Sequence, residues 1–321
     1  MAMLVVLSLT VGACSDNATV DGLADGVIRV TAEAALKGDA AQTRTDYTEV
    51  ANGGMTVKWT TGDAFRVFQG DTQQTFTLQK TDSDGKGHFS GTLTSGTATT
   101  LYALYPAAAI SSSTTTASSI ALSVAGQTQA DNGTMTHLSA KDFMRASADW
   151  NGTTGNVEFA TFTHLMAVLR LDIELPATTN VINNIVLSGM NATQTLNLTK
   201  DPAKEMEGVW NGGNSGDITL TTTNGTPDGN KKYTAYLMVF PTTTLKTLTI
   251  TVNLTGDTSG TSYTKEFTSN TGIVLNAGKR YWITVKDLDK VNGGSDSEDM
   301  GGGGSTGGGT GEGGTDNVPF D

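Results

Sequence analysis

Short runs of alternating apolar and polar residues fill the chain from Val27 onward, and this pattern restricts the possible fold most strongly. Residues 248–254 read Leu-Thr-Ile-Thr-Val-Asn-Leu, which is strict alternation. In residues 169–174, Leu and Ile alternate with Arg, Asp and Glu in the same way. A period of two predicts strands with one buried and one solvated face. Turn signals such as Asn224-Gly225 separate the runs, so the sequence predicts an all-β fold of sandwiches or barrels.

The expected strands cover most of the chain between residues 27 and 285. Only His137–Ala148 is expected to hold a helical turn. The runs predicted to form strands are Val27–Thr31, Met55–Trp59, Ala64–Phe68, Thr75–Leu78, His88–Leu93, Leu101–Tyr105, Ile120–Val124, Val157–Phe162, Met166–Leu175, Ile185–Leu187, Thr195–Leu198, Ile218–Thr221, Tyr233–Phe240, Leu248–Leu254, Tyr263–Phe267 and Tyr281–Val285.

Length and composition agree with this interpretation. A chain of 321 residues predicts two domains. Only 16% of the residues are charged, and Thr, Ser, Asn and Gly supply the polarity instead, which favours strands and turns over helices. The net charge of −12 argues against a nucleic acid partner, because phosphate binding needs clustered Lys and Arg. A Gly-, Asn- and Thr-rich stretch over residues 151–156 places the expected domain boundary near Gly155.

The C-terminal segment differs from the rest. Residues 292–321 are mostly Gly, Ser, Thr, Asp and Glu, with six acidic residues and no Lys or Arg. Such a segment cannot bury enough apolar area to fold, so a disordered Gly-rich acidic tail is predicted.

The N-terminus has the pattern of an export signal. Residues 3–11 form an apolar run that is too short to span a membrane. Val11-Gly12-Ala13-Cys14 then matches a bacterial lipobox, in which the signal is cut before the Cys and the Cys is lipidated. The sequence therefore predicts a lipoprotein signal over residues 1–14, lipidation at Cys14, and a flexible tether over residues 15–26. No Lys or Arg precedes the apolar run, which suggests either a start site further upstream or a trimmed signal.

The sequence gives no sign of a catalytic or metal centre. Cys14 is the only cysteine, and the three His lie far apart without ligand spacing. Asp82–Gly87 resembles the start of a calcium loop, but it lacks the later ligands and is predicted to be a hairpin turn. His164 follows apolar residues at an expected domain entry, so it is predicted to be a packed, hydrogen-bonded residue. We therefore predict no enzyme activity, no cofactor and no metal.

Several landmarks occur in one order along the chain, each of which reads locally as a strand, turn or core anchor. They are Thr43-Arg44-Thr45, Trp59–Phe68, Leu101–Pro106, Gly126–Gln129, Asp142–Ser147, Val157–Arg170 and Leu275–Val285. Over residues 27–290 this series resembles the fimbrillin-like proteins of Bacteroides-type bacteria, which include the major and minor fimbrial subunits and their accessory subunits.

The resemblance implies a specific organisation and function. It implies two tandem transthyretin-like β-sandwich domains, over residues 27–154 and 155–291, and export as a lipoprotein to the cell outer membrane and fimbrium. It also implies that an Arg-specific protease cuts near the N-terminus, which maps to Arg44 here. The cut would remove Val27–Thr31, and the C-terminal strand of another fimbrial subunit would fill the groove by strand addition. Arg29 lies within the expected strand and should be protected.

The C-terminus departs from this pattern, because a donor strand should alternate and this chain offers only Val318-Pro319-Phe320. A tip or accessory subunit, a surface lipoprotein that does not polymerise, and a Gly-rich spacer that presents a short docking end all remain open. The alternative function is a monomeric surface lipoprotein that binds a glycan or another host or bacterial surface ligand. That function predicts exposed aromatic rings, for which the candidates are Trp150, Trp210 and Tyr236, although core packing also explains them.

Overall fold

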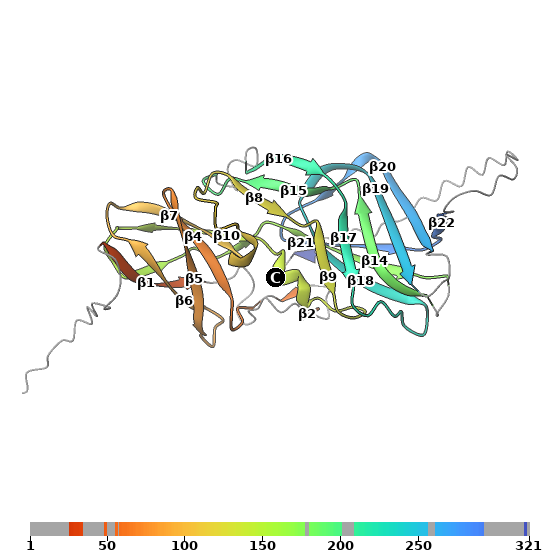
Figure 1. Cartoon of the computed structure of the whole chain (residues 1–321), viewed down its shortest axis with the longest axis horizontal. Coiled ribbons are helices and arrows are strands. Elements are labelled where there is room, and N and C mark those ends of the chain that lie inside the picture. The colour runs from red at the N-terminus through yellow and green to blue at the C-terminus, as the bar shows by residue number, and fades with distance from the viewer. Residues whose placement is uncertain are drawn as a thin grey trace, which may run out of the picture.

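A computed structural model describes residues 26–34, 58–176, 180–200, 209–255 and 261–291, and the backbone of residues 48–49, 55–56 and 318–319. The regular structure of these residues is strands and two short 3-10 helices, so the predicted all-β class is confirmed. Figure 1 shows an elongated molecule with its sheets distributed along one long axis. The predicted signal, the predicted tether up to residue 25 and residues 292–317 of the predicted tail lie outside the described residues.

An eight-stranded sheet forms one end of the molecule (Figure 1). Consecutive strands in this sheet pair antiparallel except for the parallel pair β1 and β11. In spatial order the strands are β11 (Asn156–Glu158), β1 (Val27–Ala34), β6 (Gly87–Thr94), β5 (Thr72–Thr81), β4 (Ala64–Gln69), β7 (Thr99–Tyr105), β10 (Met144–Trp150) and β12 (Thr163–His164).

Most of the remaining strands form three sheets toward the other end. The six-stranded sheet contains β22 (Asp289–Val291), β20 (Ser262–Leu275), β19 (Thr242–Thr255), β14 (Val181–Ser188), β17 (Ile218–Thr222) and β9 (Gly126–Gln129). The four-stranded sheet contains β18 (Lys232–Val239), β13 (Ala167–Glu174), β21 (Lys279–Val285) and β23 (Val318–Pro319). The three-stranded sheet contains β16 (Trp210–Ser215), β15 (Asn191–Leu196) and β8 (Ile120–Ser123), and β2 (Thr48–Glu49) pairs with β3 (Met55–Thr56).

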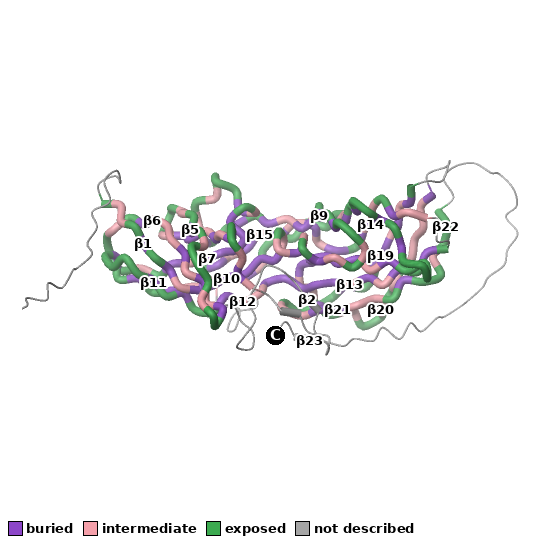
Figure 2. Tube along the Cα trace, turned by 90° about the horizontal axis from the view of Figure 1, so that it is seen from below, coloured by how far each residue is buried: buried purple, intermediate pink, exposed green. Residues whose placement is uncertain are grey.

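Two hydrophobic cores lie along the long axis, and Figure 2 shows buried chain running through both ends of the molecule. The first, here called the aromatic core, packs under the eight-stranded sheet and contains Trp59, Phe65, Phe76, Phe89, Phe159 and Phe162. The second, the larger core, lies mostly between the four- and six-stranded sheets and is rich in Leu, Ile and Val. The alternation that predicted the strands therefore matches burial, as in β19, where Leu248, Ile250 and Val252 are buried.

The helical turn expected within His137–Ala148 is present, but it is not the only one among the described residues, and the strand in the same region was not expected. A 3-10 helix spans Thr136–Ala140, but residues 144–150 form the strand β10, which pairs with β7 and β12. Met144, Ala146 and Ala148 point into the aromatic core, so the strand follows from pairing with β7 and not from its helix-forming Met and Ala. The other 3-10 helix, Ala107–Ala109, follows Pro106 at the end of β7.

Two strands that precede Gly155 pair with strands that follow it. β8 pairs antiparallel with β15, and β9 pairs parallel with β17. Conversely, β11 and β12 follow that point and pair with β1 and β10 of the eight-stranded sheet. The two parts of the chain are therefore interleaved near the middle of the molecule (Figure 1).

Candidate strand-exchange site

The first described strand, β1, lies between two other strands. It pairs antiparallel with β6 over its whole length, from Val27 opposite Thr94 to Ala34 opposite Gly87. On its other side it pairs parallel with β11, where the Thr31 N–H donates to Gly155 O at 2.8 Å and the Phe159 N–H donates to Glu33 O at 3.0 Å. Both edges of β1 are therefore hydrogen-bonded, so its departure would expose backbone groups on β6 and β11.

The inner face of β1 consists of small side chains. Val30, Ala32 and Ala34 have no exposed surface and belong to the aromatic core. Beneath them the indole of Trp59 donates from Nε1 to Ala34 O at 3.1 Å and contacts Phe89 edge-to-face, with ring centroids 5.0 Å apart. Small residues suit β1 because the rings below fill the space. A row of alternate apolar positions over an aromatic floor is the kind of groove that an extended strand can occupy.

The outer face of β1 joins a cluster of charges. The Lys86 ammonium forms ion pairs with Glu33 of β1 and, at 3.4 Å, with Glu158 of β11. The Lys86 hydrogen bond lowers the pKa of Glu33, and the same bond raises the pKa of Lys86. His88 lies 2.5 Å from Asp82 and 3.6 Å from Glu33, and its hydrogen bond lowers the pKa of Asp82. This exposed cluster links β1 to its neighbours but adds little stability at high dielectric.

The β18 edge of the four-stranded sheet is closed by side-chain amides. Each of three amides, from β9 or the loop after it, donates to a β18 carbonyl and accepts from a β18 N–H, as a neighbouring strand would. The pairs are Gln127 with Met238 O (2.8 Å) and Met238 N (2.9 Å), Gln129 with Thr234 O (2.8 Å) and Tyr236 N (2.9 Å), and Asn132 with Lys232 O (3.1 Å) and Thr234 N (2.7 Å).

Two buried titratable groups accompany this closed edge. His137 Nε2 lies 2.8 Å from Tyr236 O, and burial lowers the pKa of His137. Burial also raises the pKa of Tyr233 to about 12, and its hydroxyl accepts from Gln129 Nε2 at 3.4 Å. Burial therefore favours the neutral form of both groups. Because side chains already occupy the hydrogen-bonding groups of this edge, β18 offers no place for another strand.

The opposite edge of the same sheet, on β21, is only partly covered. β23 pairs antiparallel with its first two residues, Lys279 opposite Pro319 and Arg280 opposite Val318. Among the described residues, no strand pairs with this edge along Tyr281–Val285. Tyr281 and Val285 are buried, while Trp282 and Ile283 are half-buried and the Arg280 guanidinium lies 5.6 Å from the Trp282 ring centroid.

The residues predicted from sequence lie in different places. Cys14 and Arg44, the predicted lipidation and cleavage sites, lie outside the described residues. Arg29 lies in β1 with its side chain exposed. The prediction for His164 is confirmed, because its Nδ1 lies 2.9 Å from the Asp142 carboxylate and both side chains are buried.

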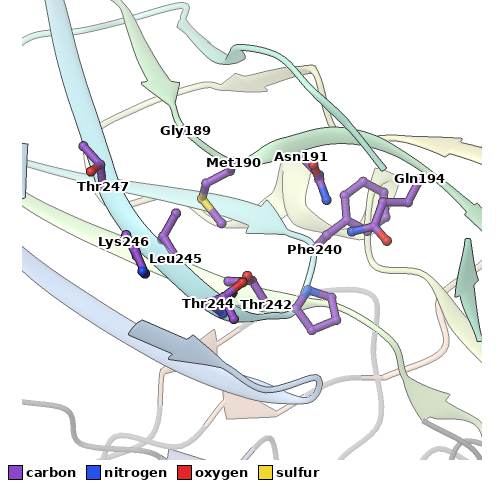
Figure 3. Close-up of a pocket in the computed structure, with 11 residues that line it drawn as sticks. Gly189, Met190, Asn191, Gln194, Phe240, Thr242, Thr244, Leu245, Lys246 and Thr247 are labelled. Atoms are coloured by element: carbon purple, nitrogen blue, oxygen red, sulfur yellow. Dashed lines mark hydrogen bonds between the residues drawn. The ribbon is translucent and has the colours of Figure 1, made fainter. Parts of the chain in front are cut away.

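The three aromatic residues named as candidate glycan platforms are largely internal. Trp150 and Tyr236 are each 3% exposed, and the Trp150 indole donates to Thr154 O at 2.9 Å. Trp210 is half-buried and contacts Phe240 edge-to-face at 5.1 Å between ring centroids. None of the three forms an exposed stacking surface. Phe240, however, borders a cavity that sequence reasoning missed (Figure 3).

The described part of the chain contains no group of three or more His, Cys, Asp or Glu arranged to hold a metal ion. In the same residues, no helix has the length and hydropathy needed to cross a bilayer. The Asp82–Gly87 segment forms the predicted hairpin turn between β5 and β6, where the Asp82 N–H donates to Lys86 O at 2.9 Å.

Comparison with known proteins gives one family and several distant structures. The model of a family described as fimbrillin-like matches residues 7–298. Comparison with curated protein sequences gives no significant match. A crystal structure of a candidate cell adhesion protein from Bacteroides ovatus is 16% identical and covers 83% of this chain and 97% of its own, with a TM-score of 0.46. A similar protein from Bacteroides fragilis is 14% identical and covers 85% and 100%, also with a TM-score of 0.46. The tip fimbrial protein Mfa3 of Porphyromonas gingivalis, solved with a C-terminal truncation, is 10% identical and covers 82% and 98%, with a TM-score of 0.34.

Proposed function

The chain belongs to the fimbrillin-like family, and from this premise we propose that it is a surface-exposed fimbrial subunit or accessory adhesin that assembles with other subunits by β-strand exchange. Family membership supports a structural, non-enzymatic role at the cell surface. The observation that carries strand exchange is the position of β1. It is held by two neighbouring strands, and it covers the aromatic core with only three buried side chains, Val30, Ala32 and Ala34.

The proposed maturation begins with cleavage after Arg44 by an Arg-specific protease. The cut falls after the end of β1 at Ala34, so it separates the whole strand from the rest of the chain. Release of β1 leaves a groove between β6 and β11 with an aromatic floor. A strand from another subunit would restore the backbone hydrogen bonds, and small apolar side chains at alternate positions would refill the places of Val30, Ala32 and Ala34.

The proposed export route places the precursor on the cell outer membrane. Lipidation of Cys14 would anchor it, and the segment up to residue 26 would tether the folded part. Cleavage after Arg44 would then free the subunit from its lipid anchor. In this scheme β1 completes the fold of the exported precursor, and cleavage removes β1 before the subunit assembles.

We also propose that the ordered chain forms two tandem transthyretin-like sandwich domains, with a boundary near Gly155. The two separate hydrophobic cores support two domains, and each core contains residues from both sides of Gly155. The pairing of β8 and β9 with β15 and β17 would then join the domains through shared sheets. The pairing of Val318-Pro319 with β21 favours a role for the chain end as a short docking strand after a Gly-rich, acidic tail that we propose to be disordered.

Limited proteolysis of the full chain tests the proposal. An Arg-specific protease should give a new N-terminus at Thr45, and the product should run as a ladder of multimers on a denaturing gel without boiling. The matched control is Arg44→Lys, which keeps the positive charge but removes the cleavage site. It should remain uncut and monomeric. Cleavage that leaves a monomer with the β1 fragment still bound would contradict strand exchange.

A further inference from the structure

A cavity of about 410 Å³ lies where the chain leaves the six-stranded sheet. Its volume is within the range of small-ligand sites. β14 ends at Ser188, and the turn at Gly189-Met190 leads into β15 of the three-stranded sheet. A side chain at Gly189, which has a φ of +101°, would approach Thr247 O to 2.4 Å, so glycine allows the turn to close against β19. Figure 3 shows side chains from β15, β19 and the β18–β19 connection around this space.

Gln194 is the unusual residue of this cavity. Burial in β15 alternates, and Gln194 occupies a core-facing position between Ala192 and Leu196. It is only 8% exposed, yet its side-chain amide makes no hydrogen bond to any of the described residues. Gln194 and Phe240 both line the cavity, as Figure 3 shows. The amide is not among the fully buried unsatisfied groups, so its donor and acceptor face the open space of the cavity.

The other buried glutamines show how this protein satisfies such groups. Gln127 and Gln129 are 6% and 0% exposed, and each amide both donates to and accepts from the β18 backbone. Gln194 has the same side chain and similar burial, but its amide meets open space. The contrast shows that, unlike Gln127 and Gln129, Gln194 presents its amide to whatever enters the cavity.

The rest of the lining indicates the chemistry of that ligand. Uncharged hydrogen-bonding side chains are frequent and no carboxylate lines the cavity, while Lys246 is its only charged residue. Met190, Leu245 and Phe240 supply an apolar wall. Amides and hydroxyls both donate and accept, as sugar hydroxyls do, and an ammonium attracts an anion. The polar lining is completed by Asn191, Gln194, Thr242, Thr244 and Thr247.

We propose that this cavity binds an acidic saccharide, with sugar hydroxyls on the Gln194 and Asn191 amides and the carboxylate toward Lys246. The apolar face of the sugar ring would lie on Met190 and Leu245. The site goes beyond subunit assembly, because none of the residues that line the cavity belongs to β1 or β21. The cavity would allow the subunit to bind a saccharide on another surface, whether or not the chain exchanges strands.

Ligand-observed NMR on the full chain tests this site, with D-galacturonic acid, D-glucuronic acid and N-acetylneuraminic acid as probes and D-glucose as the neutral probe. We expect at least one acid to bind more tightly than glucose. Gln194→Leu should weaken that acid about tenfold or more. It should not lower the melting temperature, since it replaces an unbonded amide by an apolar group of similar size.

Two further variants test whether the charge of Lys246 causes the preference for acidic sugars. Lys246→Gln should abolish the preference for acids over glucose, whereas Lys265→Gln, which removes a lysine outside the cavity, should leave binding unchanged. The proposal fails if none of the acids binds. It also fails if Gln194→Leu binds as the unmodified chain does, or if it lowers the melting temperature, which would mean that the amide supports the fold.

Discussion

The first and last described strands differ in how firmly they are built into the molecule. β1 pairs along eight residues with β6, pairs also with β11, and buries three side chains completely. β23 pairs with β21 over two residues, one of which is a proline that cannot donate to the ladder. β1 is therefore a structural part of a core, while β23 covers a fraction of one sheet edge.

The two edges of the four-stranded sheet add a second contrast. Three amides satisfy the β18 backbone from Lys232 to Met238. The β21 edge has only the two-residue β23 among the described strands. Natural sheets usually block edges that must not pair with other chains. Of the two edges of this sheet, the sealed β18 edge leaves only the β21 edge without a full partner among the described strands.

The largest effect is expected for Ala32→Asp on the inner face of β1. The carboxylate would enter the aromatic core without a partner, at a cost of about 3–5 kcal/mol in the free energy of unfolding. Urea unfolding measures this loss. Arg29→Asp adds a carboxylate to the exposed face of the same strand and should stay within about 0.5 kcal/mol of the parent. Equal effects of the two variants would mean that β1 is not packed on the core.

The next largest effect is expected for Gln129→Leu at the sealed edge. The substitution removes the acceptor of the buried Tyr236 N–H and one of the two donors to the Thr234 carbonyl, which keeps the Gly133 N–H at 2.9 Å, so the free energy of unfolding should fall by about 1–3 kcal/mol. Thermal or urea unfolding checks this. Gln194→Leu is the matched control and should cause no loss. A stable Gln129→Leu variant would show that the β18 edge does not depend on these amides.

A smaller effect is expected on acidification. Burial lowers the pKa of His137, so the folded state holds this residue neutral while the unfolded state protonates near pH 6.5. Its contribution to stability is therefore present above that pH and is lost as the pH falls toward the lowered folded pKa. The melting temperature should fall between about pH 7 and pH 5. His137→Gln should flatten this slope, and an unchanged slope would refute the assignment.

A smaller effect still is expected for Glu33→Gln in the charge cluster on β1. Lys86 keeps its ion pair with Glu158, and the pair that is lost is exposed to solvent. The melting temperature should drop slightly at low salt and not measurably at high salt, where screening already weakens the pair. Glu174→Gln, which removes an exposed carboxylate that forms no ion pair with the described residues, controls for the same change in net charge. A large loss at high salt would mean that the cluster, and not the core, holds β1.

The smallest effect is expected for removal of residues 318–321. This truncation deletes a strand that pairs at two positions only, so the melting temperature should remain that of the full chain. Calorimetry of the two proteins side by side provides the comparison. A marked destabilisation would place β23 with β1 among the integral strands and would remove the contrast between the chain ends.

Sequence reasoning predicted the strands with strong alternation and missed those without it. β1, β4, β7, β13 and β19 were expected because their side chains alternate between core and solvent. β10 and β16 were missed, because β10 is rich in helix-forming residues and β16 contains two glycines. Both segments form strands because they pair with strands that are distant in the sequence. Local sequence patterns do not show which distant strand a segment will pair with.

The candidate sites were predictable to different degrees. The β1 site followed from a family resemblance and a short alternating run. The role of Gln127 and Gln129 did not follow from sequence, because an amide that satisfies a strand edge looks like any polar residue until the edge lies next to it. Gln194 gave one local signal, a polar residue at a core-facing position of β15, but the cavity beside it arises from two separate segments, residues 189–194 and 240–247.

Hydrogen–deuterium exchange of the β6 amides that face β1 tests the central claim most directly. These amides should be protected in the uncut chain, should exchange rapidly in the cut monomer once β1 has left, and should be protected again in the multimer. Amides of β6 that bond to β5 provide the internal control and should stay protected throughout. If the β6 amides that face β1 remain exposed in the multimer, no strand has replaced β1, and assembly by strand exchange at this groove is wrong.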